Sequence, residues 1–180
     1  GLSTPLKEEG NGVKTFRMAE IVGGRAFDDG TMKRADIDAK ERAKYWLAKG
    51  DILFNRTNSF EHVGRTGIFT LDGDYAFASY LVRLSIKRDL ADPEFVNAWM
   101  NTKAFQTGVK SLASRAVGQS NISASSLAGY TIPLPPKPEQ ERIVAELEAE
   151  AAKVEAVRGL VPLYESKIQR TLARVWGPGV

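Results

Sequence analysis

The spacing of apolar residues predicts several strands in the front part of the chain. Residues 13–18 (VKTFRM) alternate between two faces, as a strand does. Two β-prone runs surround Asp72-Gly73, a pair suited to a type I′ turn, and they predict a hairpin. Residues 79–86 (SYLVRLSI) predict a further strand, and residues 45–56 are expected to form two extended pieces.

A helical period replaces this alternation further along the chain. Asp92 is a favoured N-cap residue and Pro93 suits the first helical position, so a helix is expected to begin there and to end or bend at Gly108. Shorter helices are expected at residues 38–44, and at residues 124–128 between a serine cap and a glycine. The pattern predicts that strands dominate the first half and helices the second.

A seven-residue apolar repeat marks the C-terminal segment. It predicts one long helix from Glu139 onward that pairs along a narrow seam. Gly159 and Pro162 lie inside the repeat, so a kink or break is expected near Val161. The seam either folds back on its own domain or pairs with another helix, and its length favours another helix. The seam residues are Leu147, Val154, Val157, Val161, Tyr164, Ile168 and Val175.

The bulk composition is that of a mildly basic globular chain. It has 180 residues, 43% of them hydrophobic, and a formal net charge of +3. Between Phe95 and Pro138 there are four basic residues and no acidic one, a bias that attracts polyanions or simply reflects solvated lysines. The absence of cysteine fits a reducing cytoplasm, and no apolar run approaches the roughly 18 residues of a membrane span.

Catalytic motifs are missing from the sequence. His62 is the one histidine, so Cys–His pairs and histidine-rich metal sites are excluded. Neither a phosphate-binding loop nor a nucleophile elbow occurs. The close pair Asp72 and Asp74 is expected to form a turn rather than a metal site. The sequence therefore predicts a binding module with no catalytic residues, no metal and no cofactor.

Two polar segments carry the side chains that read base edges or contact phosphates: arginine, asparagine, glutamine, histidine, serine and threonine. Solvated loops are the plain alternative, and a protein–protein adaptor with a coiled-coil helix and no DNA readout is the alternative function. The candidate DNA-binding residues are Asn55, Arg56, Thr57, Asn58, Ser59, His62 and Arg65 in the first segment, and Ser114, Arg115, Gln119 and Asn121 in the second.

Three motifs resemble one known family. Residues 50–53 (GDIL) lead into a polar loop with Gly64-Arg65, residues 118–122 read GQSNI, and residues 132–144 read IPLPPKPEQERIV. Their order and spacing are similar to those of the specificity subunit of Type I restriction–modification enzymes over about 130 residues.

The resemblance implies a target-recognition domain joined to a spacer helix. It implies sequence-specific recognition of double-stranded DNA at a bipartite site, with methyltransferase (modification) subunits and the restriction/translocase subunit as partners. It also implies that methylation, ATP hydrolysis and cleavage belong to those partners. The chain would be a half-length protein that forms a homodimer, or a fragment of a longer subunit that meets a second recognition domain.

The expected fold is therefore α+β. A mixed-sheet target-recognition domain is expected over residues 1–134, with the candidate DNA-binding segments facing DNA. Residues 130–134 are expected to be a strand, and the prolines that follow to stiffen the exit from the domain. Residues 135–180 are expected to form the proline hinge and the long coiled-coil helix.

Overall fold

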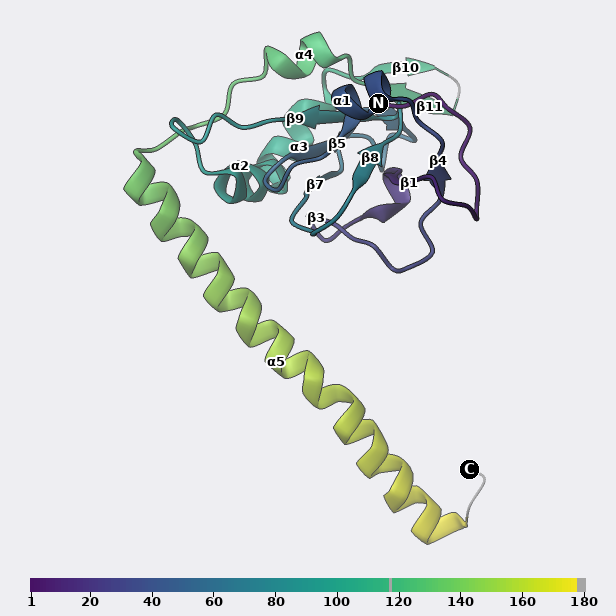
Figure 1. Cartoon of the computed structure of the whole chain (residues 1–180). Helices are drawn as coiled ribbons and strands as arrows, with labels where there is room; N and C mark the ends of the chain where they lie inside the picture. Colours follow the sequence, from purple (N-terminus) through teal and green to yellow (C-terminus); the bar gives the residue numbers. More distant parts are fainter. Residues whose placement is uncertain (117, 178–180) are drawn as a thin grey trace. The chain divides into compact units, whose positions relative to one another are not determined.

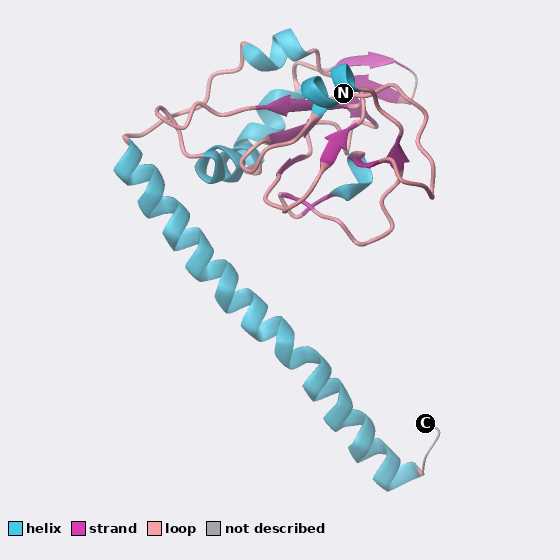
Figure 2. Cartoon of the chain, in the orientation of Figure 1, coloured by secondary structure: helices cyan, strands magenta, loops and turns pink. Residues whose placement is uncertain are grey.

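The computed structural model describes residues 1–116 and 118–177, without the side chains of residues 115 and 116. These residues divide into two units, Gly1–Gln140 and Glu141–Val180. Unit 1 holds all the strands and the shorter helices among the described residues, and most of α5 (Lys137–Trp176) forms unit 2 (Figures 1 and 2).

A five-stranded mixed sheet with the order β2-β3-β7-β5-β9 forms the centre of unit 1. Within it, strand β5 pairs antiparallel with β7 on one side and β9 on the other, so that Ile52 lies opposite both Ile68 and Leu84. All four residues of β5 are buried, as expected of a strand covered on both faces. The strands are β2 (Ile21–Val22), β3 (Arg25–Ala26), β5 (Ile52–Asn55), β7 (Thr66–Ile68) and β9 (Leu81–Leu84).

A second sheet has the order β4-β1-β8. It joins β4 (Arg34–Ala35) and β8 (Tyr75–Phe77) to opposite sides of β1 (Val13–Phe16). The strand predicted at residues 13–18 is thus confirmed over its first four residues. Phe16, Phe69 and Tyr75 pack as an aromatic cluster with ring centroids 5.4–5.8 Å apart. Residues from both sheets thus share one core.

The hairpin predicted at Asp72-Gly73 is wrong. β7 and β8 flank this turn, but β7 lies in the five-stranded sheet and β8 pairs parallel with β1. Phe69 is buried in the core between them. The local turn signal was correct, because Gly73 has a φ of +115°, but the strands on either side find better partners elsewhere.

Most helix starts agree with the sequence. α1 (Ala39–Tyr45) is capped by Asp38, α2 (Pro93–Met100) by Asp92, and α4 (Ala124–Ala128) by Ser123. Gly108 does not end the helix that begins at Pro93. Instead α2 stops at Met100, and α3 (Lys103–Lys110), capped by Thr102, contains Gly108. A short 3-10 helix, η1 (Met18–Glu20), precedes β2.

The C-terminal segment corrects two expectations. Residues 130–134 form no strand and instead run as an extended loop to α5. No break occurs near Val161, since α5 continues through Gly159 and Pro162 (Figure 1). A proline inside a helix removes one backbone hydrogen bond, and the many other backbone hydrogen bonds of a long helix keep it continuous. A kink without a break stays a prediction. Within the described residues, no helix combines the length and apolar character that a membrane span requires.

Candidate nucleic-acid interface

The two polar segments of the sequence form one small sheet. β10 (Ser114–Ala116) and β11 (Gln119–Asn121) pair antiparallel, and β11 also pairs with β6 (Thr57–Asn58). In this register Asn121 lies opposite Thr57. Gly118, with a φ of +72°, stands between β10 and β11, where an L-residue would be strained. Side chains from two distant segments are thus side by side, which no local pattern predicted.

Asn121 is oriented by the neighbouring strand. Its Oδ1 accepts hydrogen bonds from Thr57 Oγ1 at 3.1 Å and from Arg56 Nε at 3.4 Å. The backbone of Arg56 is held on both sides, since its N–H donates to Tyr80 O and its carbonyl accepts from Ile122 N. With the oxygen occupied, the side-chain N–H groups of Asn121 and the outer guanidinium N–H groups of Arg56 are the donors left for a partner.

A compact loop follows β6 directly. Val63 N–H donates to Ser59 O at 2.9 Å and Gly64 N–H to Asn55 O at 2.8 Å. On the outside of this loop, Arg65 donates to Nδ1 of His62 at 2.9 Å, and both side chains are exposed. Together with the small sheet, the loop presents what we call the polar surface: Arg56, Thr57, Asn58, Ser59, His62, Arg65, Ser114, Gln119 and Asn121.

Asn55 does not belong to this surface, and the expected contact with DNA is wrong for it. It is the last residue of β5 and is completely buried. Its Nδ2 donates to His62 O at 3.1 Å, while its Oδ1 has no partner among the described residues. Asn55 therefore shapes the loop from inside. The side chain of Arg115, the other exception, lies outside the described part of the chain.

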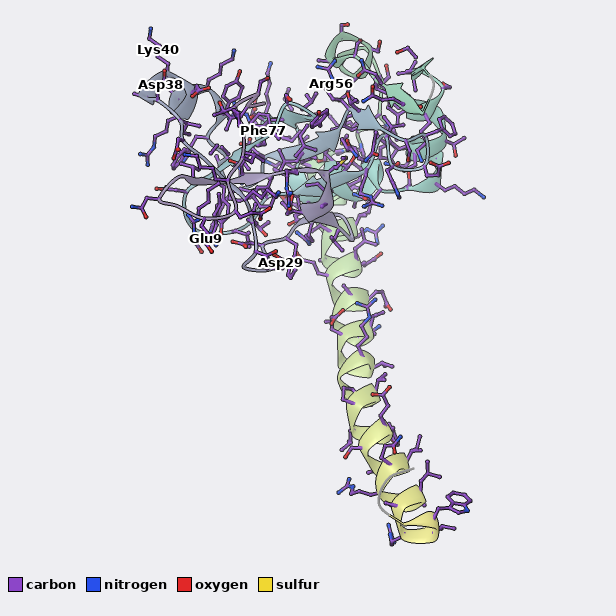
Figure 3. All side chains as sticks on the ribbon, turned by 90° about the vertical axis from the view of Figure 1, so that its right-hand side faces the viewer. Glu9, Asp29, Asp38, Lys40, Arg56 and Phe77 are labelled. Carbon is purple, nitrogen blue, oxygen red and sulfur yellow. The ribbon has the colours of Figure 1, made fainter. Side chains whose placement is uncertain are left out.

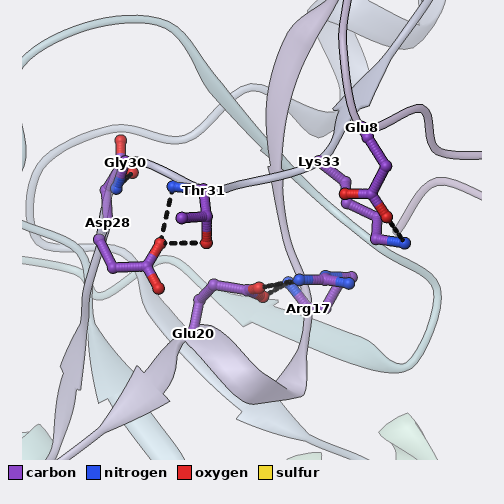
Figure 4. A network of polar contacts seen from close by, with 8 residues as sticks. Glu8, Arg17, Glu20, Asp28, Gly30, Thr31 and Lys33 are labelled. Carbon is purple, nitrogen blue, oxygen red and sulfur yellow. Dashed lines mark hydrogen bonds and ion pairs between the residues drawn. The ribbon is translucent and has the colours of Figure 1, made fainter.

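Several cations of unit 1 are paired with carboxylates. Lys14 pairs with Asp28 at 2.6 Å, Arg42 with Asp74 at 3.1 Å and Lys49 with Asp72 at 2.6 Å. Arg17–Glu20 and Lys33–Glu8 are paired as well (Figure 4). Within the described residues, Arg56 and Arg65 form no ion pair. Figure 3 places Arg56 toward the upper edge of unit 1, away from Glu9 and Asp29 at the lower edge.

One carboxylate lies next to the polar surface. Glu61 is exposed in the loop, and its own backbone N–H and the Ser59 hydroxyl hold the pKa of this carboxyl below its usual range. It is therefore ionised at neutral pH. An anion here repels phosphates, so the loop can approach DNA closely only where the neighbouring cations outweigh it.

Two residues of α3 hold the loop and were missed from the sequence. Gln106 Nε2 donates to Gly64 O at 2.8 Å, and Lys110 Nζ donates to Glu61 O at 2.8 Å. They are four residues apart and thus on one face of α3. That spacing was the available signal, but nothing local showed which segment this face would meet.

Acidic and histidine side chains do not gather into a metal site among the described residues. These residues contain no group of three or more His, Cys, Asp or Glu side chains placed to hold a metal ion. Asp72 and Asp74 are each engaged by a cation. The polar surface itself offers hydrogen-bonding groups and positive charge.

Comparison with known proteins identifies the family. Residues 5–158 match the family described as "Type I restriction modification DNA specificity domain". The match covers most of the chain, so the chain belongs to this family.

Individual relatives agree with this assignment. The chain is 26% identical over 178 residues to the Type I restriction enzyme EcoKI specificity subunit of Escherichia coli K12, covering 97% of this chain and 36% of that protein. It is 34% identical over 109 residues to a putative type I restriction enzyme MjaX specificity subunit of Methanocaldococcus jannaschii, covering 60% of this chain and 26% of that protein. The chain thus spans about a quarter to a third of these curated relatives.

Solved structures share the fold. The HsdS subunit from Thermoanaerobacter tengcongensis superposes with a TM-score of 0.60 at 21% identity, covering 91% of this chain and 43% of that one. A chain from a structure described as showing complex assembly and conformational transition of the type I R-M system superposes with a TM-score of 0.67 at 21% identity. The superposition covers 95% of this chain and 40% of that one. These likenesses confirm a mixed-sheet domain followed by a long helix.

Proposed function

We propose that this chain supplies a target-recognition domain that reads one part of a bipartite DNA site. In a Type I restriction–modification complex it would direct the methyltransferase and nuclease subunits to that site and catalyse nothing itself. Membership of the DNA specificity domain family supports this proposal. The relatives are named as specificity subunits, and the chain matches the EcoKI subunit along 97% of its own length.

One structural observation carries the choice of the DNA-facing surface. Arg56 and Arg65 extend from a surface of amide and hydroxyl side chains without a carboxylate partner among the described residues, whereas several other cations of unit 1 are ion-paired. An unpaired guanidinium retains its charge and several donors for phosphates or for the O6 and N7 atoms of guanine. The amide of Asn121 beside it adds donors for base edges.

We also propose that α5 pairs with another helix. The seam residues are exposed along α5, from Leu147 at 49% to Val175 at 65%. A stripe of this kind is stable in water when a second helix covers it. That helix belongs either to a second copy of the chain or to a second recognition domain, and the paired helices would form the frame on which the methyltransferase subunits dock.

Mapping of DNA methylation tests the function. The gene that contains this chain would be expressed with the methyltransferase subunits of its system in a host without other adenine methylation. We expect methylation at one interrupted sequence motif, lost when the gene is deleted. Methylation at the same motif without it, or none in its presence, would contradict the proposal and leave the protein–protein adaptor as the better explanation.

A further inference from the structure

A buried glutamine holds the first turn of α5 inside unit 1. Gln140 is 1% exposed. Its Oε1 accepts a hydrogen bond from Asp92 N–H at 2.8 Å, and its Nε2 donates to Pro135 O at 2.8 Å. Both ends of the amide are thus satisfied, as burial of a polar side chain requires. The first turn of α5 is therefore joined to the domain by specific hydrogen bonds as well as by the proline-rich chain.

The partner of Gln140 is the residue that starts α2. Asp92 caps α2, since its carboxylate accepts from Glu94 N–H at 2.8 Å and Phe95 N–H at 3.2 Å. Lys137, in the same turn of α5, donates to the carbonyl oxygen of Arg88 in the segment before α2. The first turn of α5 is consequently fixed at two points, one at the cap of α2 and one in the segment before it.

The other end of the α2–α3 pair meets the polar surface. Gln106 of α3 donates to Met100 O, at the end of α2, at 2.7 Å, and to Gly64 O, in the loop after β6, at 2.8 Å. Lys110 adds a hydrogen bond to Glu61 O in the same loop. A continuous path of hydrogen bonds and helices therefore runs from the first turn of α5 to the loop that carries His62 and Arg65.

We propose that α2 and α3, held by Gln140 at one end and by Gln106 at the other, form a rigid bridge that sets the spacing between the polar surface and the start of α5. Gln140 is then a positioning residue for the spacer length of the DNA target. This step rests on the proposed function: a bipartite site has two parts at a fixed separation. If the polar surface moves relative to the first turn of α5, the protein accepts DNA sites with several spacer lengths. If the polar surface is fixed to that turn, the protein accepts one spacer length.

A distance measurement tests the bridge independently of DNA. The chain has no cysteine, so spin labels can be attached at Lys40→Cys and, in the first turn of α5, at Pro138→Cys, both exposed positions of unit 1. We expect a narrow distribution of label distances that at least doubles in width in Gln140→Ala. Gln169→Ala, which removes an exposed glutamine of the same helix, is the matched control and should keep the narrow distribution.

Two results would overturn the bridge. One is an equally narrow distribution in Gln140→Ala; the other is a broad distribution already present in the unmodified chain. If Gln140→Ala does not fold, Gln140→Met replaces it, since methionine fills a similar volume but makes neither hydrogen bond.

Methylation of spacer variants tests the functional consequence. The protein in its methyltransferase complex would be given targets whose spacer is one base pair shorter or longer. We expect the unmodified complex to prefer one spacer by about tenfold, and Gln140→Ala to lose most of that preference while it reads the same bases. An unchanged spacer preference in Gln140→Ala contradicts this proposal alone, whereas methylation without base preference in the unmodified complex contradicts the proposed function.

Discussion

Single residues of the polar surface depend on a few glycines that hold its loops. Gly64 has a φ of +88°, and its carbonyl accepts from Gln106 and from Thr66. The loop after β6 therefore needs both the left-handed backbone at Gly64 and free space beside it. Gly118 has the left-handed backbone as well, but no described atom beyond its chain neighbours lies within 4 Å of the position that an added Cβ would take.

Replacement of these two glycines separates the two requirements. Gly64→Ala should lower the free energy of unfolding by about 1–2 kcal/mol for the backbone alone. It should cost more in total, because the new Cβ would lie 3.3 Å from both Gln106 Oε1 and Val109 Cγ1. Gly118→Ala should lower the free energy of unfolding by the backbone term alone, since no described atom beyond the chain neighbours lies within 4 Å of the added Cβ. If urea unfolding shows the same decrease in the free energy of unfolding for Gly64→Ala and Gly118→Ala, the described packing around Gly64 is contradicted.

Tyr75 makes the free energy of unfolding of unit 1 vary with pH in the alkaline range. Burial, and then the hydrogen bond that its hydroxyl donates to Asp28 at 2.9 Å, raise the pKa of Tyr75 to about 12. The unfolded chain has a tyrosine pKa of about 10. The stabilisation is therefore complete below about pH 10 and is lost as the pH rises toward 12; a difference of this size corresponds to about 2–3 kcal/mol.

Tyr75→Phe tests this dependence. Urea unfolding should show the unmodified chain to be more stable than the variant at pH 9, and the difference should shrink as the pH rises from 10 toward 12. A difference that stays constant over this range would show that the Tyr75 hydroxyl does not titrate as described.

At the scale of elements, local signals were predictable and pairings were not. The Asp92-Pro93 start of α2 and the Ser123 cap of α4 were predicted, because a cap involves residues within one turn. The pairing of β6 with β11 and the burial of Gln140 were not, because they join residues about fifty or more positions apart. The sequence likewise named most of the polar surface but could not separate buried Asn55 from exposed His62.

The seam of α5 is the element whose function is tested most simply. Val154→Asp would bury an unpaired carboxylate at a helix–helix contact, which is strongly unfavourable. The variant should keep the circular dichroism of a folded unit 1, become monomeric in light scattering at tens of micromolar and fail to support methylation. Ala152→Asp, about 200° around the helix, is the control and should keep the assembly.

Two results would rule out pairing of α5 with a second copy of the chain. One is a monomer for the unmodified chain at these concentrations, and the other is an unchanged mass for Val154→Asp. The first would leave the second recognition domain of a longer subunit as the partner of α5.

At the scale of the whole molecule, one recognition domain should bind DNA weakly. A half-site of about three base pairs, at roughly 1–3 kcal/mol each, adds only modestly to non-specific binding near 10⁻⁴–10⁻⁶ M. Fluorescence anisotropy with duplex DNA should show that binding by the isolated chain falls steeply between about 50 and 200 mM salt. Nanomolar binding by a monomer, insensitive to salt, would contradict a surface of this kind.

The central claim is that the polar surface reads bases, and a profile of methylation over all single-base variants of the target tests it most directly. Arg56→Ala, Gln119→Ala and Asn121→Ala would be compared with Arg42→Ala, which removes an arginine already paired with Asp74. If the claim holds, each variant of a base-reading residue relaxes specificity at one position by roughly 1–3 kcal/mol, and Arg42→Ala leaves the profile unchanged. Profiles identical to that of the unmodified protein for all three polar-surface variants would contradict the claim.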